Sequence, residues 1–187
     1  QKKIKFIKLN FLDKKAVENI IKHLKPEVIY YFAGQSSIYK SLKKPKSTLD
    51  SNFYGAKVFL DIIHKNKLNI KFFKANSGYI FESLKYDKTL KYKFLKPNNP
   101  YLDAQIKAFK AVEKFRKLGV KCYSLIFFNI ESPLKEKNFI FSKVKNFIKT
   151  KKTKFLKVGN IDVVRDFSWA PEIMQGVFYA SKIQTQD

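Results

Sequence analysis

Two side chains near the middle of the chain have the spacing of an acid–base pair. Tyr101 and Gln105 lie four residues apart in a stretch of helical periodicity, so they share one face of a helix. A phenol there can exchange a proton, and a lysine at position 105 would stabilise its ionised form by roughly 3 kcal/mol at about 5 Å. A glutamine cannot supply that charge. The sequence therefore indicates proton transfer by Tyr101. The glutamine at position 105 makes that transfer less favourable, because it does not stabilise the ionised phenol.

Small and polar residues follow three predicted strands, at residues 33–37, 76–79 and 129–133. In an open α/β sheet, ligands bind beyond the carboxyl ends of the strands. Small and hydroxyl side chains let a ligand approach the backbone and offer hydrogen-bond partners. Ordinary turns use the same residue types, so each segment could either bind a ligand or simply form a turn.

Neither cysteine nor histidine chemistry is indicated. Cys122 is the single cysteine and lies in an apolar run, so neither a disulfide framework nor a cysteine metal site can form. His23 and His64 have no neighbouring ligand at metal-binding spacing. We expect no metal and a reducing, cytoplasmic setting.

The net charge of +24 first suggests nucleic acid or an anionic membrane. All but two of the 39 basic residues are lysines, however, and they are scattered among many Ile, Asn and Phe residues. Arginine forks usually read phosphates and bases, and only Arg116 and Arg165 are present. No stretch approaches the ~20 apolar residues of a membrane span. We expect a soluble protein without a nucleic-acid or membrane partner.

Short apolar runs alternate with longer helical patterns, which indicates βαβ units and an α/β fold with a parallel sheet. The predicted strands are residues 4–9, 27–33, 70–75, 121–128 and 155–158. The predicted helices are residues 14–24, 48–65, 101–117, 139–149 and 171–181. Residues 82–99 and 133–138 are predicted loops, and a long loop of the first kind is often functional.

The chain starts at Gln1 without a methionine or a signal sequence, which indicates truncation. We expect residues 1–187 to form a single incomplete domain.

Taken in order, these segments resemble the GDP-mannose 4,6-dehydratase branch of the extended short-chain dehydrogenase/reductase family. The matching stretches are residues 25–37, 71–77, 100–101, 127–133 and 158–167. The resemblance implies a partial, Rossmann-like, doubly wound parallel sheet. The family's first strand and glycine-rich phosphate loop would precede Gln1, so this piece should bind a dinucleotide poorly.

The resemblance also implies a reaction. In the family, NADP takes a hydride from C4 of the mannosyl ring of GDP-mannose, water is lost across C5 and C6, and the hydride returns to C6. Tyr101 would match the acceptor of the C4 hydroxyl proton, and Ser77 would hydrogen-bond the same oxygen. Cofactor contacts would fall on Ala33, Gln35, Tyr101 and Gln105.

Two catalytic positions depart from the family pattern. Gln105 replaces the lysine and would keep only a hydrogen bond to the nicotinamide ribose. Tyr79 replaces the glutamate that removes the C5 proton, and a phenol with a pKa of about 10 is a poor base at neutral pH. Glu82, three residues on, is a weak substitute because the family has a small residue there.

The substrate pocket follows from the same resemblance. Lys135 would lie near the phosphates and Arg165 toward the nucleotide, although turn capping or a local ion pair would also explain some of these residues. The other expected substrate contacts are Ser36, Asn129, Glu131 and Ser132. The helix that starts near Tyr101 commonly forms a subunit contact in this family, which implies a homo-oligomer.

The sequence also fits other functions. The altered positions 79 and 105 would also fit a family member that has lost activity and serves as a sugar-nucleotide binding or assembly subunit. A related epimerase is possible, because the residues that would decide are both changed. A lysine-rich nucleic-acid module ranks last.

Overall fold

The computed structural model describes residues 4–81, 93–137, 139–150, 154–160, 162 and 164–183. Contacts within the chain divide it into two compact units, residues 1–126 (unit 1) and 127–187 (unit 2). The expected single incomplete domain stays a prediction.

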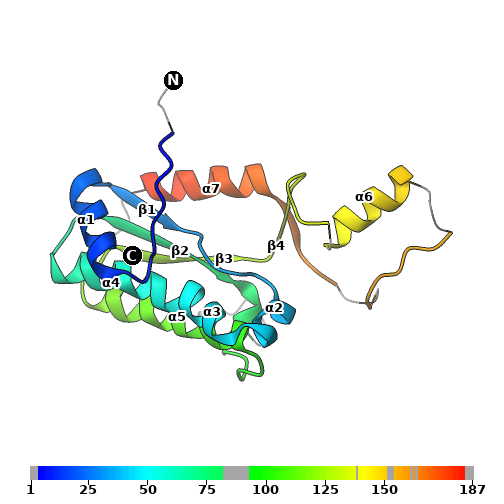
Figure 1. Ribbon diagram of the computed structural model, residues 1–187, viewed down its shortest axis with the longest axis horizontal. Helices are drawn as coiled ribbons and strands as arrows, with labels where there is room; N and C mark the ends of the chain where they lie inside the picture. Colours follow the sequence, from blue (N-terminus) through cyan, green and yellow to red (C-terminus); the bar gives the residue numbers. More distant parts are fainter. Residues whose placement is uncertain are drawn as a thin grey trace. The chain divides into compact units, whose positions relative to one another are not determined.

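Unit 1 is built on a sheet with strand order β1-β2-β3, and helices α4 and α5 lie side by side on one face of it (Figure 1). β1 and β2 run parallel, with Tyr31 opposite Lys74. The elements that lie in this unit or begin in it are α1 (Lys14–Leu24), β1 (Val28–Tyr31), α2 (Ile38–Lys43), α3 (Pro45–Leu49), η1 (Asp50–Tyr54), α4 (Gly55–Lys65), β2 (Lys71–Ser77), η2 (Gly78–Ile80), α5 (Pro100–Lys117) and β3 (Cys122–Phe127).

Side chains that cap the first turn fix where two helices of unit 1 begin. The Asp13 side chain accepts a hydrogen bond from the backbone of Ala16 at 3.0 Å, which caps α1 at the predicted residue. Asn99 caps α5 in the same way through Leu102, followed by Pro100 in the first helical turn. These caps fix the start of the helix that carries Tyr101.

The core of unit 1 lies between the sheet and the helices α1, α4 and α5. Alternate residues of a strand face opposite sides, so Phe72 and Lys74 face this core while Phe73 stacks with Tyr30 and Tyr123 on the other side. Phe72 is fully buried and contacts the rings of Tyr31 and Phe59. One face of the sheet thus packs against the helices.

Unit 2 contains a short parallel pair of strands with two helices. Asn129 is opposite Phe167 in this pair. The elements are β4 (Asn129–Glu131), α6 (Ile140–Thr150), β5 (Phe167–Trp169) and α7 (Ala170–Lys182).

The predicted α/β class with parallel strands is confirmed, but two predicted strands are wrong. Residues 4–9 and 155–158 form no strand. Ile4 and Phe6 are 82% and 92% exposed, and no partner strand pairs with them among the described residues. Alternation of apolar and polar residues can predict which side chains would face the core, but a strand also needs a neighbouring strand to form hydrogen bonds with. Of the predicted loop at 82–99, residues 82–92 lie outside the described part.

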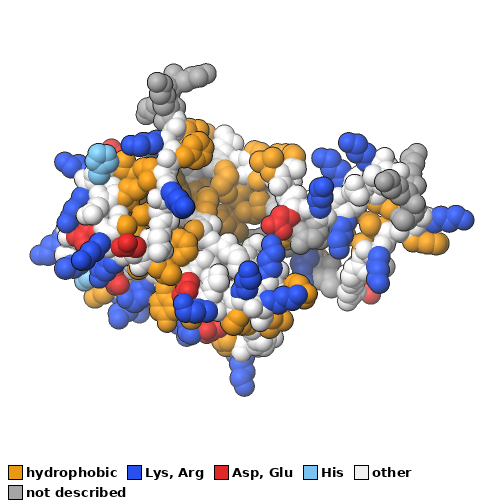
Figure 2. All heavy atoms as spheres, viewed as in Figure 1, with side chains coloured by type: hydrophobic (Ala, Val, Ile, Leu, Met, Phe, Trp, Pro, Cys, Tyr) orange, Lys and Arg blue, Asp and Glu red, His pale blue; other side chains and the backbone are white. Residues whose placement is uncertain are grey.

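The described residues contain no helix long and apolar enough to cross a bilayer. Nor do they contain a group of three or more His, Cys, Asp or Glu residues that could hold a metal ion. Lys and Arg side chains are distributed over the visible face among hydrophobic and uncharged areas (Figure 2).

Candidate active site

Ser77 and Tyr101 form a hydrogen-bonded pair at the carboxyl end of β2. Ser77 is the last residue of that strand, and its side chain bonds to Tyr101 in the first turn of α5. Burial raises the pKa of the Tyr101 phenol, and the hydrogen bond from Ser77 opposes that rise. The sequence predicted both residues, and the structure places them together.

Gln105 lies one helical turn beyond Tyr101 and is 5% exposed. Its Nε2 donates to Asn52 Oδ1 at 2.9 Å. Its Oε1 is buried and has no hydrogen-bond partner among the described residues. A buried carbonyl oxygen without a donor is uncommon, so this atom is available to a hydroxyl or an amide of a bound molecule.

Asn52 connects α5 to the loop that follows β1. Its Nδ2 donates to the backbone oxygens of Gln35 and Thr48, each at 3.1 Å. Gln35 Nε2 in turn donates to Thr48 Oγ1 at 2.9 Å. Gly34 has φ of 147°, and a Cβ there would lie 2.4 Å from Asn52 Oδ1, so only glycine fits.

Asn52 stands in η1, a π-helical turn inside the continuous helical stretch from α3 to α4. Such turns often mark functional positions, because they change which side chains face inward. The sequence reading missed Asn52. A polar residue in the middle of an otherwise amphipathic helix was the available signal.

The other predicted site residues of unit 1 lie at the same edge of the sheet. Ala33 and Ser36 are exposed, and Gln35 is half-buried. Tyr79 is 40% exposed, and its backbone nitrogen donates to Ser77 Oγ at 3.2 Å. Glu82 lies outside the described residues.

Unit 2 holds the remaining predicted site residues, which lie around the β4–β5 pair. Asn129 Nδ2 donates to the backbone oxygen of Asp166 at 2.9 Å, next to the exposed Arg165. Lys135 Nζ lies 2.8 Å from Glu131 Oε1, with both side chains largely buried. Ser132 Oγ accepts a hydrogen bond from a nearby backbone nitrogen. A common pocket formed with unit 1 stays a prediction.

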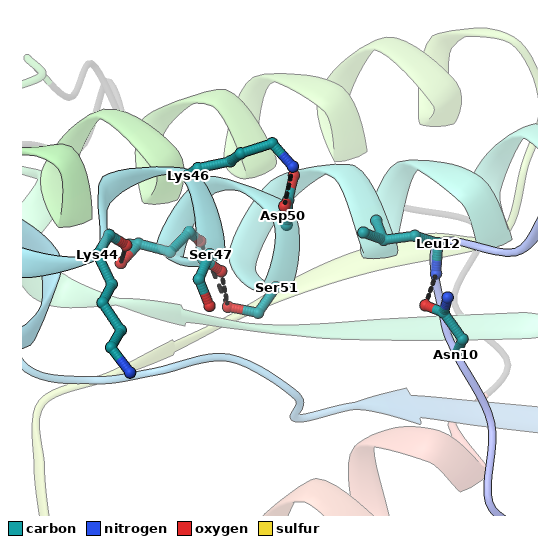
Figure 3. Close-up of polar contacts among 8 residues, drawn as sticks. Asn10, Leu12, Lys44, Lys46, Ser47, Asp50 and Ser51 are labelled. Carbon is teal, nitrogen blue, oxygen red and sulfur yellow. Dashed lines mark hydrogen bonds and ion pairs between the residues drawn. The ribbon is translucent and has the colours of Figure 1, made fainter.

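A cavity of about 560 Å³ lies elsewhere in unit 1, between the segment before α1 and the start of α3. Figure 3 shows its polar contacts, including Lys46 with Asp50 at 3.4 Å and Ser51 with Ser47. Its lining is Phe11, Leu12, Lys43, Lys44, Pro45, Lys46, Ser47, Asp50 and Ser51. None of the predicted site residues is among them.

A second residue that sequence reasoning missed is Lys74, which is only 1% exposed. Its Nζ donates to the backbone oxygen of Ala75 and lies 5.7 Å from the centroid of the Tyr31 ring. Burial lowers its pKa to about 8. The only signal was its even spacing from Phe72, which places both on one strand face.

Comparison with known proteins identifies the relatives of this chain. A model of the GDP-mannose 4,6 dehydratase family matches residues 1–187. A GDP-mannose 4,6-dehydratase of Sinorhizobium fredii is 28% identical over 169 residues, which cover 85% of this chain and 47% of the relative. The corresponding Homo sapiens protein is 25% identical over 172 residues, with 89% and 46% covered. The chain thus spans about half the length of these curated relatives.

Two solved structures have a fold similar to that of this chain. RMD from Pseudomonas aeruginosa, complexed with NADPH, superimposes with a TM-score of 0.78 at 20% identity and covers 94% of this chain and 61% of its own. UDP-glucuronic acid 4-epimerase from Bacillus cereus, in complex with UDP-glucuronic acid and NAD, gives 0.80 at 17% identity, covering 97% and 56%. At these identities the likeness establishes the fold, which is Rossmann-like.

Proposed function

The chain belongs to the GDP-mannose 4,6-dehydratase family, and on this premise we propose that it serves a lyase that converts GDP-mannose to GDP-4-keto-6-deoxymannose. The hydrogen bond between Ser77 and Tyr101 is the observation that carries the proposal. This pair lies at the sheet edge where ligands bind in such folds, which supports a role in proton transfer. The activity is proposed for the whole protein, of which this chain supplies the described groups.

Tyr101 acts on the C4 hydroxyl of the hexose. Its ionised phenol accepts the hydroxyl proton, while the Ser77 hydroxyl donates a hydrogen bond to the oxygen on which charge develops. Burial disfavours the phenolate, so the bond from Ser77 matters more than it would in water. Proton transfer at this pair is the chemical core of the proposal.

The residues present fit a nicotinamide cofactor. The unpartnered Gln105 Oε1 can accept a hydrogen bond from a ribose hydroxyl, and Asn52 holds the amide in the orientation that leaves this oxygen free. A bound NADP would supply the hydride acceptor and donor that the dehydration requires. The NADPH of the Pseudomonas aeruginosa relative supports this choice of cofactor.

The C5 proton presents a harder step, because Tyr79 stands where a carboxylate would serve as base. Tyr79 is 40% exposed, and its backbone nitrogen donates to Ser77 Oγ, so this residue directly adjoins the catalytic pair. A phenol removes a carbon-bound proton more slowly than a carboxylate does at neutral pH. We propose that this step limits the rate.

Unit 2 would bind the nucleotide sugar through Asn129, Glu131, Ser132, Lys135 and Arg165. Lys135 is paired with Glu131 at 2.8 Å, so a diphosphate would have to compete with that carboxylate for the ammonium. Arg165 is exposed and can offer its planar fork to a phosphate or a base. We also propose a homo-oligomer in the cytoplasm.

A second candidate function is supported by Tyr79 and Gln105. With both altered, the protein would bind a sugar nucleotide without turning it over and would act as a binding or assembly subunit. Tyr79→Glu combined with Gln105→Lys distinguishes the two functions. An active parent excludes this second function, whereas activity that appears only in the double variant establishes it.

Product analysis tests the first function. The full-length gene product is incubated with GDP-mannose and NADP, and the sugar nucleotides are followed by mass spectrometry and NMR. Dehydration predicts the loss of one water and a 4-keto signal. An isomer of unchanged mass would identify an epimerase, and unchanged GDP-mannose that nevertheless binds would exclude catalysis.

A further inference from the structure

Glu131 and Lys135 form a partly enclosed ion pair at the end of β4. Glu131 is the last residue of that strand, and its Oε1 atom lies 2.8 Å from Lys135 Nζ. The Lys135 side chain is only 19% exposed and that of Glu131 only 13%, although most of the described lysines are exposed. An ion pair withdrawn from water contributes little net stability, so stability alone does not explain this pair.

The ammonium of Lys135 is held by more than the carboxylate. Its Nζ atom also donates to the backbone oxygen of Ile130 and lies 4.6 Å from the centroid of the Phe139 ring. Both of these partners are neutral. The backbone of the lysine is fixed as well, because its nitrogen donates to Ser132 O at 3.2 Å and its oxygen accepts from Ser142 Oγ at 3.3 Å. The ammonium therefore keeps its place when the carboxylate leaves.

The carboxylate of Glu131 is the less constrained member of the pair. Within the described residues, Lys135 is the one partner of that carboxylate. Carboxylates and phosphates both bind an ammonium through charged oxygens, and a diphosphate carries more negative charge than a carboxylate. A diphosphate can therefore take the position beside Lys135 Nζ, whereas an uncharged ligand gains nothing there that would offset the lost ion pair.

We infer that Glu131 is a specificity-determining residue: its carboxylate takes, in this structure, the position beside Lys135 that a phosphate takes in the complex, and a diphosphate binds by replacing it. The inference rests on the proposed binding of a sugar nucleotide by unit 2. Glu131 sets the charge that a ligand needs in order to reach the ammonium, so it favours nucleoside diphosphates over uncharged nucleosides.

Glu131→Gln tests the exchange by titration of the full-length protein with GDP. The amide keeps the size of the side chain and can still accept a hydrogen bond from Lys135, but it carries no charge and is easier to displace. We expect GDP to bind about five- to tenfold more tightly to the variant. Guanosine, which has no phosphate, should bind both proteins alike. Unchanged or weaker binding of GDP to the variant overturns the inference.

Glu136→Gln is the matched control, because it removes the same charge from an exposed position just after Lys135. Exposed charges are screened by salt, so this change should raise the affinity for GDP by less than about twofold. Lys135→Met should weaken GDP binding, and Glu131→Gln added to it should recover little. Equal gains in the Glu131 and Glu136 variants would reflect net charge alone and would overturn the inference.

The unmutated protein offers a measurement that does not depend on a variant folding. Glutamate is labelled with ¹³C at Cδ, and the Glu131 signal is assigned by its absence from the Glu131→Gln spectrum. GDP should shift this signal, because the carboxylate loses its ammonium, while the signal of the exposed Glu172 in α7 should stay in place. A Glu131 signal that does not move when GDP binds overturns the inference.

These measurements separate the inference from the proposed dehydration, since none of them needs turnover. An active dehydratase in which Glu131→Gln weakens GDP binding would keep the proposed function and overturn the exchange. An inactive protein in which GDP displaces Glu131 would keep the exchange and overturn the proposed catalysis. Failure of GDP to bind the parent and the Glu131 variant alike overturns the exchange as well.

Discussion

Gln105 Nε2 donates to Asn52 Oδ1 at 2.9 Å, across 53 residues of chain. The Asn52 Nδ2 group donates its hydrogens to the backbone oxygens of Gln35 and Thr48, so only the Asn52 Oδ1 atom can face α5. These bonds fix the orientation of the side-chain amides of both Asn52 and Gln105. Position 105 therefore presents an acceptor to a ligand, where a lysine would present a donor.

Asn52→Leu tests the importance of this link. The change keeps the approximate shape but leaves buried backbone oxygens and the Gln105 amide without partners, which should cost about 2–4 kcal/mol of unfolding free energy. Urea denaturation measures the loss. Asn66→Leu is the control, because Asn66 is half-buried and its side chain bonds to Ile62 O at 2.9 Å and to Glu18, outside this network. Equal losses in the two variants would contradict the network.

Gly34→Ala tests the close approach of the β1 loop to Asn52. The new Cβ would lie 2.4 Å from Asn52 Oδ1, so the loop or the amide must move. Gly119→Ala is the control, since Gly119 also has positive φ, at 84°, but no atom lies within 4 Å of the added carbon. We expect the Gly34 variant to lose about 2 kcal/mol more than the control in thermal unfolding. A loss no larger than that of the control would argue against the contact.

Local signals predicted much of the fold, but long-range contacts decided the site. The Asp13 cap and the apolar face of α1 suffice to define residues 14–24. The partners of Asn52 and the burial of Lys74 depend on which segments pack together, and sequence spacing does not carry that information. A lysine in a strand is normally assigned to the surface, and the even spacing of Lys74 from Phe72 is a weak signal against that assignment.

Ser77→Ala should alter the pH dependence of turnover in the full-length protein. The Ser77 bond lowers the pKa of Tyr101, so its removal raises that pKa. Because the ionised phenol is the active base, the rise of kcat with pH should move to higher pH. Ser124→Ala, which removes a hydroxyl bonded to Asn76 instead, should leave the profile in place. A shift to lower pH would contradict the assignment of Tyr101 as base.

Lys74→Met should change the pH dependence of stability. The pKa of Lys74 falls from 10.5 to about 8 on folding, so the unfolded chain binds more protons between these values. The charged amine therefore destabilises the native state below pH 8, and this penalty of about 3 kcal/mol disappears as the pH rises to 10.5. The advantage of the Met variant over the parent should narrow across this window. A constant difference in urea unfolding would show that burial does not lower the pKa.

The most direct measurement compares the parent, Tyr101→Phe and Tyr54→Phe as full-length proteins for the conversion of GDP-mannose with NADP. Tyr54 lies in η1 and is 45% exposed, so its phenylalanine variant controls for loss of a phenol as such. We expect 4-keto product from the parent and the Tyr54 variant, and a rate about 10²–10⁴-fold lower from Tyr101→Phe. Equal rates for Tyr101→Phe and the parent would contradict it.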